Sequence, residues 1–143
     1  SLLDPVRSHV EMELAPMCLA HGIGIVPYSP LGAGMLTGKY RRGQPLPDSV
    51  RADSNAAHRF SDTNWDIIET LIEVAEQGGQ SPASAATNWL LSKPWVTAPI
   101  VGANSPEQLL ETLGDLDRPL PPEGIDRLDA VSDFVRSRAS LEV

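Results

Sequence analysis

The sequence has very little cysteine, because Cys18 is the single one among 143 residues. One thiol excludes an internal disulfide and any metal site built from several cysteines. It favours a reducing compartment, so we expect the protein to be cytoplasmic. We expect Cys18 itself to be packed on a helix face. An initiating methionine is also absent, so Ser1 is not expected to be the native start.

Long apolar runs are missing as well. No run approaches the roughly 18 residues that a membrane span needs, and no segment resembles a signal peptide. The three histidines, His9, His21 and His58, do not have the spacing of metal ligands. The sequence therefore predicts neither a membrane segment nor a metal centre.

Positive charge is scarce: 11 Lys and Arg oppose 19 Asp and Glu, which leaves a formal net charge of −8. Such a chain repels phosphate backbones, which argues against general nucleic-acid binding. One small anionic ligand is not excluded, because local cations and helix ends can outweigh the mean field. Lys39, Arg41, Arg42 and Arg51 gather in a long loop over residues 35–61. Loops of this length are typical of functional lids or of disordered segments.

Hydrophobic periodicity and turn residues predict helices alternating with two short strands. The two apolar, β-branched segments 23–28 and 96–101 are typical of buried strands. The predicted helices span residues 13–21, 62–78, 82–93, 106–113 and 122–131. This order indicates an α/β fold with a parallel sheet. Two strands cannot cover four to five amphipathic helices, so part of the sheet is expected to be missing from the chain.

Two segments that follow the predicted strands could carry chemistry. Residues 28–34, Tyr-Ser-Pro-Leu-Gly-Ala-Gly, combine small residues with a hydroxyl and would let backbone N–H groups approach a phosphate. Residues 102–108, Gly-Ala-Asn-Ser-Pro-Glu-Gln, open a helix whose N–H groups favour an anion. Both lie where α/β sheets place their sites.

Each segment also has a purely structural interpretation. Glycine and proline after a strand usually only turn the chain, and a capped helix after a strand is ordinary architecture. Tyr28 suits the core as well as a stacking surface, and the cations from Lys39 to Arg51 suit a solvated loop. Spacing alone does not decide between these interpretations.

Several motifs taken together closely resemble the C-terminal half of the aldo-keto reductases. They are residues 28–40, YSPLGAGMLTGKY; residues 89–91, WLL; residues 99–103, PIVGA; and residues 107–109, EQL. The resemblance covers about residues 1–132, in order and with natural spacing. It implies that residues 1–134 form the part of one barrel that follows the sixth strand, and that 135–143 are a polar tail.

The resemblance implies a (β/α)₈ TIM barrel, of which this chain would hold two parallel strands and four to five helices. It also implies carbonyl reduction with NADPH, or sometimes NADH, by hydride transfer. Tyr28 would stack under the nicotinamide, and Lys39 and Arg51 would lie in the loop over the cofactor. The pyrophosphate loop would hold Ser29, Leu31, Gly32, Ala33 and Gly34, and the adenosine with its 2′-phosphate would meet Gly102, Asn104, Gln108 and Glu111.

Two positions depart from the family pattern. Asn104 stands where many members carry Ser or Arg, and Thr112 stands where Asn commonly follows the glutamate. An asparagine can donate to a phosphate but brings no charge. The choice between NADP(H) and NAD(H) is therefore left open.

The family's catalytic Asp, Tyr, Lys and His lie in the first half of the barrel, so we expect no catalytic residue in this chain. The favoured interpretation is the cofactor-binding half of an NADP(H)-dependent reductase of small carbonyl compounds, inactive by itself. The alternatives are a non-catalytic nucleotide-binding or regulatory half-barrel, and a degenerate piece without function. Self-association and pairing with the missing half-barrel are the assemblies expected of open strand edges.

Overall fold

Helix α4, Asp62–Gly78, supplies much of the apolar core. Ile68, Ile72 and Ala75 are buried along one stripe, as their spacing predicts. The Ser61 side chain accepts a hydrogen bond from the Asn64 N–H at its start, and Gly79 ends it in a left-handed conformation. The structure is a computed structural model that describes residues 1–4, 7–47 and 60–133.

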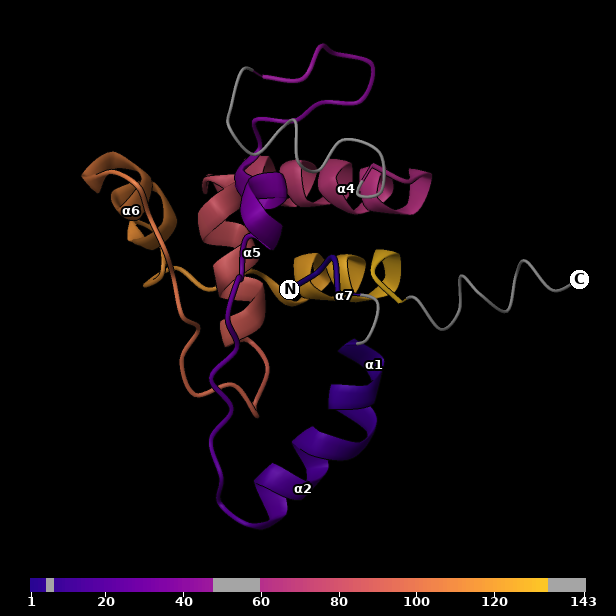
Figure 1. Cartoon of the computed structure of the whole chain (residues 1–143), viewed down its shortest axis with the longest axis vertical. Helices are drawn as coiled ribbons and strands as arrows, with labels where there is room; N and C mark the ends of the chain where they lie inside the picture. The colour runs from indigo at the N-terminus through magenta and orange to yellow at the C-terminus, as the bar shows by residue number, and fades with distance from the viewer. Residues whose placement is uncertain (5–6, 48–59, 134–143) are drawn as a thin grey trace, which may run out of the picture.

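Three helices form the centre of the described structure. Helix α5, Pro82–Leu91, crosses α4, and helix α7, Pro122–Val131, packs on α4 as well (Figure 1). Helix α6, Pro106–Leu113, lies against α5 and exposes its leucines to solvent. The helices predicted from residue 62 onward are thus confirmed. The core consists of Leu2, Met35, Leu36, Tyr40, Ile67, Ile68, Leu71, Ile72, Val74, Ala75, Ala85, Ala86, Trp89, Leu90, Leu120 and Leu128.

The first helical segment begins earlier than the periodicity predicts. It runs from α1, Arg7–His9, through a π-helical turn, Val10–Leu14, into α2, Ala15–Ala20. Pro16 lies inside this continuous helical segment, and the widened π-helical turn directly before it accommodates a residue that has no N–H to donate. Cys18 is buried, as expected.

The two predicted strands appear only as two isolated parallel bridges within the described ranges, Ile25 with Val96 and Tyr28 with Ile100. The N–H of Thr97 donates to Ile25 O at 2.9 Å, and that of Ile100 donates to Pro27 O at 2.8 Å. Pro27 and Pro99 have no N–H, which interrupts the ladder. The prediction of a buried strand over 23–28 is wrong here, because no third described segment covers it. Its apolar side chains stand half exposed, Ile23 at 53% and Val26 at 51%.

Some sequence predictions fall outside the described residues. They concern Arg51 and His58, most of the second half of the 35–61 loop, and the polar tail 135–143. The described part of that loop contains the end of a 3₁₀ helix, Gly32–Thr37, and the buried Tyr40. No helix in the ranges that the structure describes is long and apolar enough to cross a membrane.

Trp89 on α5 is fully buried and joins three helices. Its indole Nε1 donates to Asp129 Oδ1 on α7 at 2.8 Å. The same carboxylate accepts from Lys93 Nζ at 2.6 Å, and the Arg7 guanidinium of α1 lies 4.9 Å from the ring centroid. Arg7 also donates to the Ser132 carbonyl oxygen just past α7. Removing the carboxylate would leave a buried indole donor without its acceptor.

We therefore expect Asp129→Ala to lower the free energy of unfolding by about 1–3 kcal/mol, the cost of an unsatisfied buried donor. Asp126→Ala removes an equal charge from an exposed position on the same helix and should change it by less than about 0.5 kcal/mol. Urea denaturation followed by tryptophan fluorescence measures both. Equal losses in the two variants would contradict the role given to Asp129.

Gly38 lets the end of the 3₁₀ helix approach α5 closely. Its φ is +81°, and a Cβ added there would lie 2.6 Å from Pro82 Cγ. Gly43 has a similar φ of +75° but open space around the added atom. The two glycines therefore separate the cost of a left-handed backbone from the cost of a steric clash.

Gly43→Ala should lower the free energy of unfolding by about 1–2 kcal/mol through the left-handed backbone alone. Gly38→Ala should cost about 1–3 kcal/mol more, because Pro82 belongs to a helix and cannot easily move. Thermal or urea denaturation of the two variants gives the difference. Equal costs would show that the close approach to Pro82 is not maintained in solution.

Candidate functional site

A groove of about 740 Å³ lies between the two segments that follow the bridges. One wall starts at Tyr28 and the other at Ile100, and these two residues form one parallel bridge. Both walls therefore begin on the carboxyl side of the paired segments, where α/β folds place ligand sites. The groove is lined by Tyr28, Ser29, Pro30, Leu31, Ala33, Gly34, Thr37, Gly38, Lys39, Ala83, Ile100, Val101, Gly102, Ala103, Asn104, Gln108, Glu111 and Thr112.

The first wall contains an unusual run of left-handed residues. Gly32, Ala33 and Gly34 have φ values of 55°, 57° and 91°, and Ser29 has 52°. Such φ values are costly for Ser29 and Ala33, which carry a Cβ. Backbone strain of this kind concentrates at ligand sites. The N–H groups of Gly32 and Gly34 already donate to Ser29 O at 3.1 Å and Leu31 O at 3.0 Å, so the turn offers small residues and close approach more than open donors.

Lys39 places a cation beside this turn. Its Nζ lies 5.0 Å from the ring centroid of Tyr40 and 3.6 Å from the position that a Cβ on Gly34 would take. Tyr40 is buried, and its ring meets Phe60 with centroids 5.3 Å apart. The Lys39 ammonium thus lies beside the ring of Tyr40, which is held by packing, and close to Gly34.

The second wall is the start of α6, and two of its backbone donors are already used. The Gln108 N–H donates to Ser105 Oγ, and Gln108 Oε1 accepts from the Asn104 N–H at 3.0 Å. A hydrogen bond from the Ser105 hydroxyl, together with one from its own backbone N–H, lowers the pKa of Glu107. Pro106 has no N–H. The expectation that this helix start offers open N–H groups to an anion therefore fails at Asn104 and Gln108, whereas no described residue accepts from the N–H groups of Ala103 and Ser105.

Helix α5 fixes this second wall in place. Ser84 is fully buried, and its hydroxyl donates to the carbonyl oxygens of Glu111 at 2.8 Å and Thr112 at 3.1 Å. Ser81 donates to the Glu111 carbonyl oxygen at 2.7 Å as well. Glu111 also lines the groove, and none of the residues that the structure describes donates a hydrogen bond to its carboxylate.

The structure brings nearly all the predicted cofactor residues to this groove. Gly32 is an exception, since it lines a neighbouring cavity, and Arg51 lies outside the described residues. Thr37 and Ala83 also line the groove and were not predicted, because only their packing reveals them. The predicted residues that line it are Tyr28, Ser29, Leu31, Ala33, Gly34, Lys39, Gly102, Asn104, Gln108 and Glu111.

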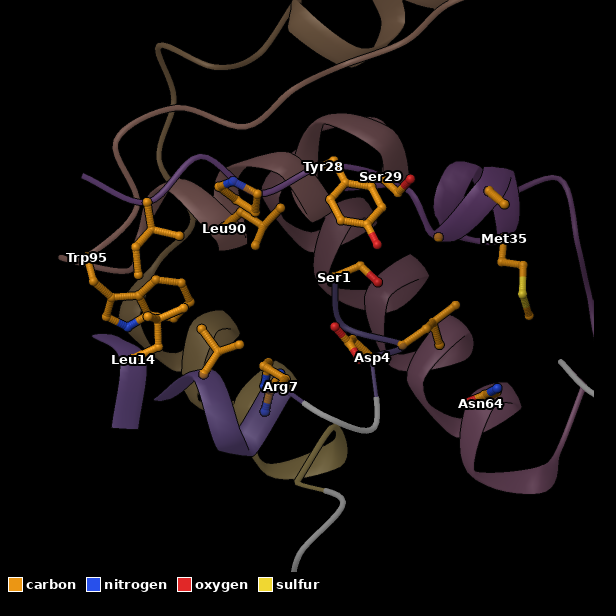
Figure 2. Close-up of a pocket in the computed structure, with 16 residues that line it drawn as sticks. Ser1, Asp4, Arg7, Leu14, Tyr28, Ser29, Met35, Asn64, Leu90 and Trp95 are labelled. Carbon is orange, nitrogen blue, oxygen red and sulfur yellow. The ribbon is translucent and has the colours of Figure 1, made fainter. Parts of the chain in front are cut away.

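The neighbouring cavity, of about 610 Å³, shares Tyr28, Ser29 and Ala33 with the groove. In Figure 2 the Tyr28 ring reaches into it toward Ser1. Tyr28 is 78% exposed, so its interpretation as a core residue is wrong. The Tyr28 ring, between the groove and the neighbouring cavity, is therefore available for stacking against a ligand.

Ionisable groups are few in the groove. Its lining, as far as the structure describes it, contains Tyr28, Lys39 and Glu111 and no Asp or His. Across the described ranges, no group of three or more His, Cys, Asp or Glu side chains could hold a metal ion. The groove thus has features of a binding site, with three ionisable side chains in its described lining.

Comparisons with known proteins give the family. The chain is 31% identical over 137 residues to a protein named "Putative voltage-gated potassium channel subunit beta" from Schizosaccharomyces pombe, covering 90% of this chain and 39% of that protein. It is 35% identical to a "Probable voltage-gated potassium channel subunit beta" from Oryza sativa subsp. japonica, covering 87% of this chain and 40% of the relative. An "L-glyceraldehyde 3-phosphate reductase" from Escherichia coli is 34% identical over 102 residues, covering 68% of this chain and 30% of the enzyme.

The chain therefore spans about two fifths or less of the length of these curated relatives. The sequence model of the Aldo/keto reductase family matches residues 1–133. A match over nearly the whole chain is decisive, and the chain belongs to the aldo-keto reductase family, whose fold is a TIM barrel.

Proposed function

We propose that this chain forms the cofactor-binding part of an NAD(P)H-dependent reductase of small carbonyl compounds. The observation that carries the proposal is the groove, in which predicted residues from two distant segments meet. Its volume of about 740 Å³ suits a small-molecule or cofactor ligand. Family membership supports an oxidoreductase role, since aldo-keto reductases generally use NAD(P)H on small carbonyl substrates.

The residues fit such a cofactor. The Lys39 ammonium would hold the pyrophosphate by charge, and the small residues of the left-handed turn at Gly32–Gly34 would let it come close to the backbone. The exposed ring of Tyr28 would support the nicotinamide from one side. A nicotinamide bound there supplies hydride to a carbonyl carbon. The adjoining cavity, which Tyr28 also lines, offers room for the carbonyl substrate.

Lys39→Ala tests the groove directly. Losing a charge-assisted contact at an exposed position should weaken binding of NADH and NADPH by about five- to tenfold. Arg41→Ala removes the same charge two residues away, from a side chain that does not line the groove, and should weaken binding less than about twofold. Titration of the full-length protein by isothermal calorimetry at fixed ionic strength measures both. Equal weakening of nucleotide binding by the two variants would show that Lys39 does not contact the cofactor.

A second candidate is a non-catalytic, nucleotide-binding or regulatory module that assembles with another chain. Two of its relatives carry the name of a channel subunit, which favours association with a partner. Half-exposed Ile23 and Val26, with Ile100 at 57% exposure, leave an apolar edge on the bridged segments. Self-association and pairing with the remainder of a barrel would both cover this edge.

Turnover separates the two candidates. We expect the 143-residue chain alone to show no NAD(P)H-dependent aldehyde reduction, because the proton donor implied by the family resemblance lies elsewhere. We expect the complete protein to reduce aldehydes, with consumption of NADH or NADPH followed by absorbance. A complete protein that binds nucleotide without turnover would favour the regulatory module. Turnover by the chain alone would overturn the assignment of the acid to another segment.

A further inference from the structure

Lys39 differs from most other cations of the chain because no described carboxylate pairs with it. The chain carries a net charge of −8, and most Lys and Arg side chains in the described ranges form ion pairs with carboxylates. These are Arg7, Arg42, Lys93, Arg118 and Arg127. Lys39 forms no such pair with any residue that the structure describes, and it is the one cation in the described lining of the groove. Its positive charge is therefore available to a ligand.

The Lys39 ammonium contacts an aromatic ring instead. Its Nζ lies 5.0 Å from the ring centroid of Tyr40 and, at the same time, 3.6 Å from the position that a Cβ on Gly34 would take. The ring therefore does not draw the ammonium away from the groove. An aromatic ring attracts a cation through its quadrupole and carries no net charge. The ammonium is thus held beside Gly34 without being neutralised.

The ring of Tyr40 is itself fixed by packing. Tyr40 is 2% exposed, and its ring meets that of Phe60 with centroids 5.3 Å apart. Phe60 in turn stacks on Trp65 of α4, with centroids 4.9 Å apart and an interplanar angle of 24°. A continuous row of aromatic rings therefore leads from α4 to the cation of the groove. A lysine side chain that already lies against a fixed ring loses less conformational freedom when a ligand binds.

We propose that Tyr40 is a positioning residue of the groove, whose ring holds the Lys39 ammonium beside Gly34 with its charge unneutralised. This rests on the proposed function, in which Lys39 meets the pyrophosphate of the cofactor. A carboxylate in the place of the ring would also hold the ammonium, but it would compete with the pyrophosphate for the same N–H donors. The role needs the face of the ring and not its hydroxyl group, so phenylalanine should perform it as well.

The test is a double-mutant cycle on the full-length protein, in which isothermal calorimetry at fixed ionic strength gives the dissociation constants of NADH and NADPH. Tyr40→Leu should weaken binding of both nucleotides by about two- to fivefold, the effect of one lost cation–π contact. In a Lys39→Ala background the same change should alter binding by less than about 1.5-fold, because no ammonium is left to orient. A residue that served only to pack the core would weaken binding equally in both backgrounds. That result, or tighter binding by Tyr40→Leu, would overturn the inference.

Tyr40→Phe is the matched control. It keeps the ring and removes only the hydroxyl group, so it should bind both nucleotides within about 1.5-fold of the unchanged protein. Binding as weak as that of Tyr40→Leu would contradict a role for the ring face. Circular dichroism before titration shows whether each variant is folded.

A second measurement needs no change at Tyr40 and serves also if Tyr40→Leu does not fold. In NMR spectra of the unchanged full-length protein, the Cε protons of Lys39 are identified by their absence in Lys39→Ala. They should lie upfield of the usual lysine position, because the Nζ beside them lies over the ring. Resonances at the usual position would show that the contact is not maintained in solution and would overturn the inference.

The outcomes separate this inference from the proposed function. If the unchanged protein binds NADH or NADPH and the cycle shows no coupling between Tyr40 and Lys39, the inference alone is overturned. If the unchanged protein binds neither nucleotide, the proposed function is overturned, and the inference with it.

Discussion

The hydrogen bond from the Ile100 N–H to the Pro27 carbonyl, 2.8 Å long, ties together the segments from which both walls of the groove start. A second hydrogen bond, from the Thr97 N–H to the Ile25 carbonyl at 2.9 Å, joins the same two segments, so the left-handed turn and the start of α6 both follow one paired region. Helix α5 contacts both walls. Pro82 packs against Gly38 of the first wall, and the Ser84 hydroxyl donates a hydrogen bond to the Glu111 carbonyl oxygen of α6 in the second wall. The groove is thus fixed by one backbone pairing and one helix.

The helices could be predicted from the sequence because their signals are local. Ser61 and Gly79 mark the ends of α4, and the buried stripe between them follows from the helical period. The joining of the two site segments was also predictable, since each follows an apolar run and parallel segments share an edge. The resemblance to the aldo-keto reductases supplied the roles of individual residues, and the family match confirms the resemblance.

Other features depend on contacts that are distant in the sequence. The described residues pair segments 23–28 and 96–101 only with each other, and Pro27 and Pro99 lack the N–H that a longer ladder needs, so isolated bridges result. The partners of Trp89 come from α1, from the turn after α5 and from α7, and no local sequence pattern predicts these contacts. The exposure of Tyr28 likewise depends on distant parts of the chain, because the described residues cover little of its side chain.

The start of α6 shows how one sequence signal can support two incompatible uses. Ser105 followed by Gln108 is the pattern of a well-capped helix, and the same helix start also suggests a phosphate site. Both uses require the same few N–H groups. Each donor that a cap occupies is lost to a ligand, so a strong cap lowers the capacity of a helix start for anions. Gln108 occupies the Asn104 N–H, and Ser105 occupies the Gln108 N–H. A ligand phosphate at the start of α6 would therefore reach the N–H groups of Asn104 and Gln108 only if the cap opened.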